Sequence, residues 1–135
     1  MKKIILLSII FIMTGCLGEI GKGYINKTCT KQENINGKIK TTTINIKSKQ
    51  GNVEKITITE KYDENLEIKS ILNSKKSEQN SYKNEPGINM ELNNNEFIYN
   101  IDTKNITENI KTKFNIKEEQ HKQIKHYEED GYNCK

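Results

Sequence analysis

The sequence contains no arginine, tryptophan or alanine, and it has a single proline, a single valine and two histidines. All 22 of its basic residues are lysines, and asparagine is abundant. This bias fits A+T-rich coding better than selection for a basic ligand surface. Without arginine, the chain lacks the planar donor that binds phosphate or guanine through two hydrogen bonds at once. We therefore expect no nucleic-acid partner.

The two histidines offer little material for a catalytic or metal site. His121 and His126 are five residues apart, which places them about 140° apart around a helix, so they cannot bind one metal ion together. Glu118 with His121, and His126 with Asp130, have spacings that share a helix face. In so charged a stretch, a solvated helix face is the expected explanation.

The motifs of the common hydrolases and nucleotide-binding proteins are also missing. The chain has no serine nucleophile elbow, no HExxH motif and no glycine-rich phosphate loop. The adjacent glutamates at 118–119 and 128–129 point about 100° apart on a helix and form no acid–base pair. We expect no enzyme, no cofactor and no metal. The alternative is a small-ligand-binding or enzymatic envelope protein that uses His121 and His126 with nearby carboxylates.

Residues 1–15 have the pattern of a bacterial secretory signal peptide. Lys2 and Lys3 form its positive start, and Ile4–Ile12 is an apolar run that only Ser8 interrupts. This run is shorter than the roughly 20 apolar residues that cross a bilayer. It therefore fits a signal that is removed better than a permanent membrane span.

The stretch Met13-Thr14-Gly15-Cys16 resembles the lipobox of bacterial lipoproteins, in which small residues precede a cysteine that is diacylated before cleavage. Two or three acyl chains, palmitate among them, would anchor Cys16 stably, because each buried CH₂ contributes about 0.8 kcal/mol. We expect a lipid-anchored protein on the extracytoplasmic face of the cell membrane. The alternative is an ordinary secretory signal with an incidental cysteine.

Two further cysteines, Cys29 and Cys134, remain near opposite ends of the mature chain. An even number in an extracytoplasmic compartment favours one structural disulfide. Two free thiols and a redox-active pair are the alternatives, and the absence of CxxC spacing counts against the second. A bond across so long a loop would stabilise the fold by about 4 to 5 kcal/mol at most.

The mature chain is long enough for one domain, which we place at residues 27–135 after a lipidated tether at 16–26. Three strands are predicted from Lys27 to Tyr62, with turns at 36–37 and 50–52. Ile39 is out of phase with Ile44 and Ile46, which suggests a bulge or a register change in the second strand.

A helix, a hairpin and a C-terminal helical region follow. The helix is expected at 63–81, fraying after Ser77, and the hairpin at 88–101 around a turn at 93–95. Asp102 and Thr103 are candidate caps of a short segment that runs to Phe114, and 116–130 is a charged helix that ends before Gly131. The predicted fold is α+β, with an antiparallel sheet of about five strands and helices packed on one face.

The layout resembles the YehR-like family of small bacterial lipoproteins. The likeness covers residues 13–135, and its distinctive residues are Cys16, Cys29, Gly131 and Cys134. The biochemical role of the family is not established. The resemblance therefore implies an α+β lipoprotein domain and supplies no catalytic residue.

The expected function is a non-catalytic binding or accessory module of the cell envelope, monomeric, whose partner is another envelope protein or a wall polymer. Enzymes, enzyme inhibitors and purely structural surface proteins are the alternatives. Five tyrosines form either a binding patch for a peptide or glycan or the edges of the core: Tyr62, Tyr82, Tyr99, Tyr127 and Tyr132. A flat exposed sheet face would favour a protein partner, and a closed polar pocket a small ligand.

Overall fold

The computed structural model describes residues 23–35, 37–63 and 69–135. The expected signal peptide at 1–15, Cys16 and the first part of the tether lie outside these described residues. Where the description of the tether begins, Tyr24–Asn26 already belong to the first strand. Within the same residues, none of the helices has the length and apolar character that a membrane crossing requires.

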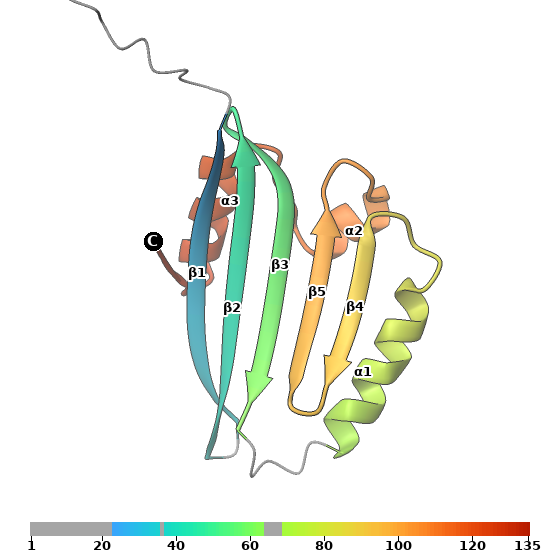
Figure 1. The fold of residues 1–135 in the computed structure, drawn as a ribbon. Coiled ribbons are helices and arrows are strands. Elements are labelled where there is room, and N and C mark those ends of the chain that lie inside the picture. Colours follow the sequence, from blue (N-terminus) through green and yellow to red (C-terminus); the bar gives the residue numbers. More distant parts are fainter. Residues whose placement is uncertain (1–22, 36, 64–68) are drawn as a thin grey trace, which may run out of the picture.

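The fold is α+β and is built on an antiparallel sheet with the strand order β4-β5-β3-β2-β1-β6 (Figure 1). Its elements are, in chain order, β1 (Tyr24–Ile35), β2 (Lys38–Lys49), β3 (Asn52–Tyr62), α1 (Lys69–Tyr82), β4 (Ile88–Asn93), β5 (Glu96–Asp102), α2 (Glu108–Lys113), α3 (Gln120–Glu129) and β6 (Asn133–Cys134). The described part of the sheet has six strands, one more than expected, because the short β6 pairs with the outer edge of β1.

The first three strands form the predicted meander. Between β2 and β3, Gln50 and Gly51 both have positive φ angles of 52° and 80°, which is the geometry of a tight two-residue hairpin turn. The β4–β5 hairpin then adds to the meander through β5, where Tyr99 lies opposite Ile58 on β3. The β1–β3 meander and the β4–β5 hairpin, each built from neighbouring segments of the sequence, thereby form one continuous sheet.

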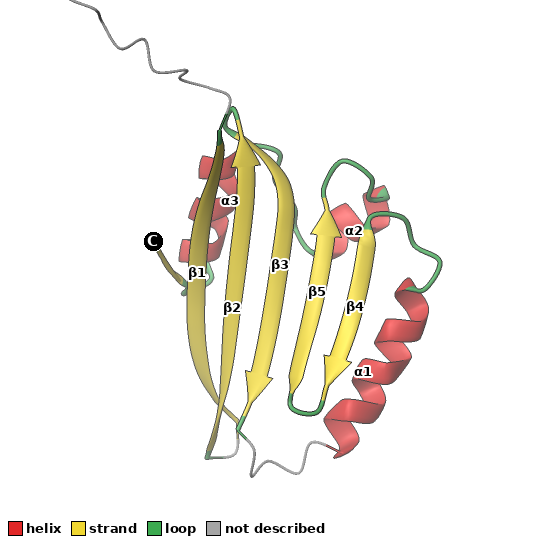
Figure 2. Cartoon of the chain, in the orientation of Figure 1, coloured by secondary structure: helices red, strands yellow, loops and turns green. Residues whose placement is uncertain are grey.

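One face of this sheet is buried and carries the core. Ile44, Ile56, Phe97 and Ile101 are at most 2% exposed. Helix side chains complete the same core cluster, with Tyr82 from α1, Ile110 from α2 and Tyr127 from α3. In Figure 2, α2 and α3 lie behind the sheet and α1 runs beside β4. The opposite face is not covered by any described helix.

Ile39 does not mark a bulge, so this prediction was wrong. The β1–β2 register is continuous past it, and the register shift lies instead between Lys47 and Ser48. Ile39 points to the opposite face from Ile44 and Ile46 and is 45% exposed, because uninterrupted alternation places it on the uncovered face.

Two helix ends also differ from the predictions. Helix α1 continues past Ser77 to Tyr82, because the end of the helix is fixed to the sheet: Gln79 Nε2 donates to the Met90 carbonyl over 2.8 Å. The cap of α2 is Thr107, whose hydroxyl accepts from the Ile110 amide, and not Asp102 or Thr103. Asp102 instead accepts from the Lys104 amide in the preceding turn.

Candidate functional site: the open face of the sheet

The structure brings Cys29 and Cys134 together. They are opposite one another in the β1–β6 pair, and their sulfur atoms lie at disulfide-bonding distance. Cys29 is completely buried in the core cluster. The geometry therefore gives these two cysteines a structural position, and the third, Cys16, lies outside the described residues.

The two histidines have separate surroundings on α3. His121 is exposed, with its Nδ1 3.6 Å from a Glu119 carboxylate oxygen. His126 is more covered, with its Nε2 3.5 Å from Asp130 and 3.1 Å from the Asn115 amide nitrogen. Of the two spacings that share a helix face, His126 and Asp130 do lie close together, whereas His121 lies near Glu119 and not Glu118.

The glutamates of this helix region are engaged in surface ion pairs. Glu118 pairs with Lys111 at 2.8 Å, and Glu119 with Lys122. These pairings lower the pKa of both carboxyl groups. Across the residues that the structure describes, no group of three or more histidine, cysteine or acidic side chains is placed to hold a metal ion.

The tyrosines do not form a surface patch. Tyr62, Tyr82, Tyr99 and Tyr127 are 3–6% exposed and belong to the core, and Tyr132 packs against it. Their rings stack on aromatic neighbours, as Tyr82 and Tyr99 do at a centroid distance of 6.4 Å. The hypothesis of a tyrosine-bearing binding surface is therefore wrong, and the core interpretation holds.

A charged network lies between α1 and the buried face. Glu78 accepts hydrogen bonds from the hydroxyls of Tyr82 and Tyr99, both 2.9 Å long. Lys75 joins Glu78 to Glu60 on β3, with 2.5 Å between its Nζ and the Glu60 carboxylate. Burial opposes ionisation of Glu78, yet these hydroxyls and lysines keep its pKa below the ordinary value. The network fixes α1 to the sheet.

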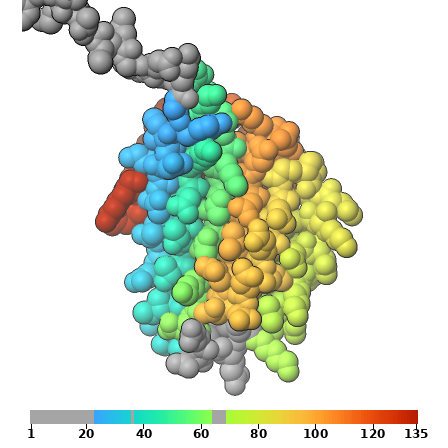
Figure 3. All heavy atoms as spheres, in the orientation of Figure 1, coloured from blue at the N-terminus to red at the C-terminus, as the bar shows by residue number. Residues whose placement is uncertain are grey.

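The uncovered face of the sheet carries side chains that take no part in the core. Two rows of side chains cross it from strand to strand. One row runs Thr30, Thr43, Thr59, Ile98, Glu91, and the next runs Thr28, Asn45, Thr57, Asn100, Asn89. We call these ten positions the open face. Figure 3 shows the strands side by side at the surface in this view.

Short polar side chains dominate the open face and are partly fixed by hydrogen bonds. The Thr28 hydroxyl bonds to Asn45 over 2.9 Å, and Thr57 to Asn100 over 3.2 Å. Glu91 is the one charged residue in the two rows, although charged residues make up 30% of the chain. Interface centres in proteins are similarly poor in charge.

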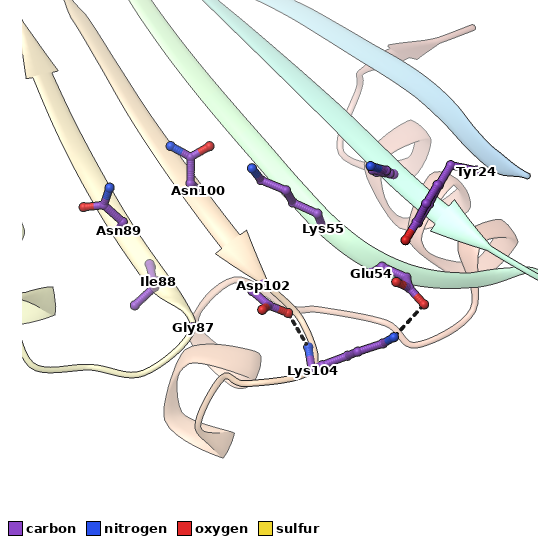
Figure 4. A pocket seen from close by; sticks show the side chains of 10 residues that line it. Tyr24, Glu54, Lys55, Gly87, Ile88, Asn89, Asn100, Asp102 and Lys104 are labelled. Carbon is purple, nitrogen blue, oxygen red and sulfur yellow. Dashed lines mark hydrogen bonds and ion pairs between the residues drawn. The ribbon is translucent and has the colours of Figure 1, made fainter.

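A shallow groove of about 560 Å³ opens at one end of the uncovered face (Figure 4). Its lining includes Tyr24, Lys47, Lys55, Asn89, Asn100 and Lys104. Lys104 is held by Glu54 at 2.8 Å, and this pairing raises the pKa of Lys104. A second cavity of about 350 Å³ lies between α1 and β4. Both are open to solvent, so neither is the closed polar pocket of a small-ligand site.

Comparison with known proteins identifies no relative of this chain, so the candidate site is described from its geometry alone. No family matches this chain, and neither the curated proteins nor the solved structures gave a match. The open face was not singled out from the sequence. Its signal is present, however, in the alternation of threonine with isoleucine in β2 and β3 and in Asn45 and Asn100.

Proposed function

We propose that this protein is a lipid-anchored lipoprotein of the bacterial cell envelope, non-catalytic, which binds another envelope protein through the open face. The anchor is Cys16, supported by the lipobox-like residues before it. The proposal retains the resemblance to the YehR-like lipoproteins, which rests on Cys16, Cys29, Gly131 and Cys134. The single observation that carries the binding role is that the two central rows of the uncovered side, the open face, are poor in charge.

The open face would lose little side-chain conformational entropy when it binds a partner. Long lysine and glutamate side chains lose much rotamer freedom when an interface orders them, whereas short side chains lose little. Thr43 and Thr59 lie directly opposite each other at the middle of the open face and carry short, β-branched side chains. A sheet or loop of the partner protein can pack there and form hydrogen bonds with the threonine and asparagine side chains.

A protein partner is favoured over a small ligand because the face is flat and extended. Ten positions spread over five strands suit a broad contact, and specific protein interfaces bury about 800 Å² on each partner. The histidines of the enzymatic alternative lie on α3, on the covered side of the sheet, and each has its own carboxylate partner.

Position-specific photocrosslinking tests the proposal. A photoreactive residue at Asn45, on the open face, should capture one discrete protein on intact cells, and one at the exposed Lys125 of α3 should not. Combining the crosslinker with Thr43→Lys and Thr59→Lys should lower capture at least tenfold, because two desolvated lysines would oppose binding.

The exposed Thr112→Lys, on α2, is the matched control and should leave capture unchanged. Equal capture from positions 45 and 125, or capture that survives the double substitution, would contradict the open face as the binding surface.

A further inference from the structure

The end of the sheet where β1 begins is the end nearest the proposed anchor. Tyr24 opens β1 and pairs with Lys49 at the end of β2. Only seven residues lie between Cys16 and Tyr24, so eight Cα-to-Cα steps connect them. At about 3.3–3.6 Å per residue, they reach at most about 29 Å. If Cys16 is acylated, this end of the sheet therefore stays close to the bilayer surface.

This end combines exposed apolar groups with lysines. Tyr24 and Ile25 are each 50% exposed, and together with Ile39 they are the large apolar side chains that the described structure leaves exposed. The Lys47 ammonium lies 3.9 Å from the centre of the Tyr24 ring, and that of Lys49 lies 5.6 Å away. An amphipathic aromatic ring flanked by lysines is the composition that favours a membrane–water interface.

Among the described residues, the lysines at this end face one another and have no ion-pair partner. Lys47 lies directly opposite Lys55 on the neighbouring strand, an arrangement of like charges that is unfavourable by itself. Within the described residues, Lys47, Lys49 and Lys55 form no ion pair.

Two acidic side chains lie beside these lysines. Glu54 is paired with Lys104 (Figure 4). Asp102 lies opposite Lys55 in the sheet, and its two carboxylate oxygens accept from the Lys104 amide and the Asn105 side chain. Among the described residues that line or border the groove, four lysines (Lys47, Lys49, Lys55 and Lys104) therefore face two carboxylates, which leaves an excess of positive charge.

We propose that this end of the sheet, formed by Tyr24, Ile25, Lys47, Lys49 and Lys55, rests on the anionic phospholipid headgroups of the membrane to which the protein is anchored. The inference rests on the proposed lipid anchor, which supplies the high local concentration that so small a patch requires. Anionic headgroups supply the negative charge that pairs with the three lysines, and the Tyr24 ring enters the membrane–water interface.

The contact would orient the binding surface. The β-strands run away from this end, and Thr30 lies six residue steps beyond Tyr24 along β1. At about 3.3 Å per residue, the row that contains Thr30 lies about 20 Å along the strand from the proposed contact. The open face would then stand beside the membrane, facing a partner that is itself close to the bilayer.

The absence of tryptophan makes a direct test possible. Tyr24→Trp places a single fluorescent reporter at the proposed contact, and Ile39→Trp places one at the other end of the sheet at a similar exposure. Each full-length, processed lipoprotein is reconstituted into vesicles of equal parts phosphatidylglycerol and phosphatidylcholine with brominated acyl chains. We expect bromine quenching at position 24 to exceed that at position 39 at least twofold.

Charge variants then test the role of the lysines. Lys47→Gln, Lys49→Gln and Lys55→Gln together, or vesicles of phosphatidylcholine alone, should reduce quenching at position 24 at least twofold. Glutamine at Lys38, Lys69 and Lys76, which lie elsewhere on the surface, is the matched control and should have no effect.

Intact mass separates the two levels of the proposal. Acylated protein with equal quenching at positions 24 and 39, or with quenching at position 24 that is indifferent to lipid charge, would overturn the headgroup contact and leave the anchor intact. Protein without acyl mass would overturn the anchor and the contact together.

Discussion

Cys29 on β1 lies directly opposite Cys134 on β6, with 4.0 Å between their Cα atoms across a sequence separation of 105 residues. Beside them, Thr28 and Lys135 exchange two backbone hydrogen bonds of 3.1 and 2.9 Å. The C-terminus is thereby fixed to β1, the strand that follows the proposed anchor.

The first prediction concerns this pair. The mature protein should be two hydrogen atoms lighter under non-reducing conditions, with Cys29 and Cys134 resistant to alkylation. Cys29→Ser with Cys134→Ser should lower the free energy of unfolding by about 4 to 5 kcal/mol at most, because the unfolded chain regains the entropy of an open loop. Two thiols that alkylate readily in the native protein would contradict the bond.

Glu78 predicts a pH dependence of stability. Its folded pKa lies below the ordinary value of 4.5, so its ionised form stabilises the fold above that pH. This contribution is lost as the pH falls through the folded pKa. Glu78→Gln should cost about 1–2 kcal/mol at pH 7, since it weakens two hydrogen bonds to a charged acceptor.

The difference between wild type and Glu78→Gln in urea denaturation should be smaller at pH 3 than at pH 7, because the contribution begins to be lost once the pH falls below 4.5. The exposed Glu128→Gln is the control and should change stability at neither pH. A cost of Glu78→Gln that is the same at both pH values would show that its ionisation is not what stabilises α1 on the sheet.

Much of the architecture was predictable because it is encoded locally. The turn at Gln50-Gly51 and the alternation of Ile56 with Thr57 define the meander, and α3 ends before Gly131 as expected. The remaining features could not be predicted because they join segments that are distant in the sequence. These are the pairing of β5 with β3 and the two-residue strand β6 that pairs with β1.

The candidate surface was less predictable than the fold. The size and amphipathic character of tyrosine are compatible with a binding patch, but the chain has few other large apolar residues, and the tyrosines complete its core. The polar residues after Ser77 predict fraying of α1, whereas the helix continues to Tyr82. Gln79 lies in a polar stretch that by itself favours exposure to solvent, whereas in the fold its side chain donates a hydrogen bond to the Met90 carbonyl of the edge strand β4.

Glycine substitutions give a stringent test of the packing between β4 and the turn after β5. Gly87 has a φ of +73°, and a Cβ there would lie 2.7 Å from backbone atoms of Asn105 and Ile106. Gly51 has a φ of +80° with nothing within 4 Å. Gly51→Ala should therefore cost only the left-handed backbone penalty of about 1–2 kcal/mol.

Gly87→Ala should cost clearly more, by about 1–3 kcal/mol beyond that penalty, because backbone must move. Denaturant titration of both variants measures the difference. Equal costs would contradict the close approach at Gly87.

The histidines are predicted to be dispensable. His121→Gln with His126→Gln should leave photocrosslinking from Asn45 unchanged, because neither ring lies on the open face and the new glutamine at position 126 can still hydrogen-bond to Asn115. Loss of capture in this variant, with unfolding unchanged, would support a role for α3 and the enzymatic or small-ligand alternative.

The modification state of Cys16 tests the central claim most directly. Mass spectrometry of the N-terminal peptide, from protein extracted from membranes of growing cells, should find a chain that begins at Cys16 and carries diacylglyceryl mass, with the protein released to the aqueous phase by Cys16→Ser. A mature chain that begins at another residue, or an unmodified Cys16 thiol in membrane-bound protein, would contradict the account.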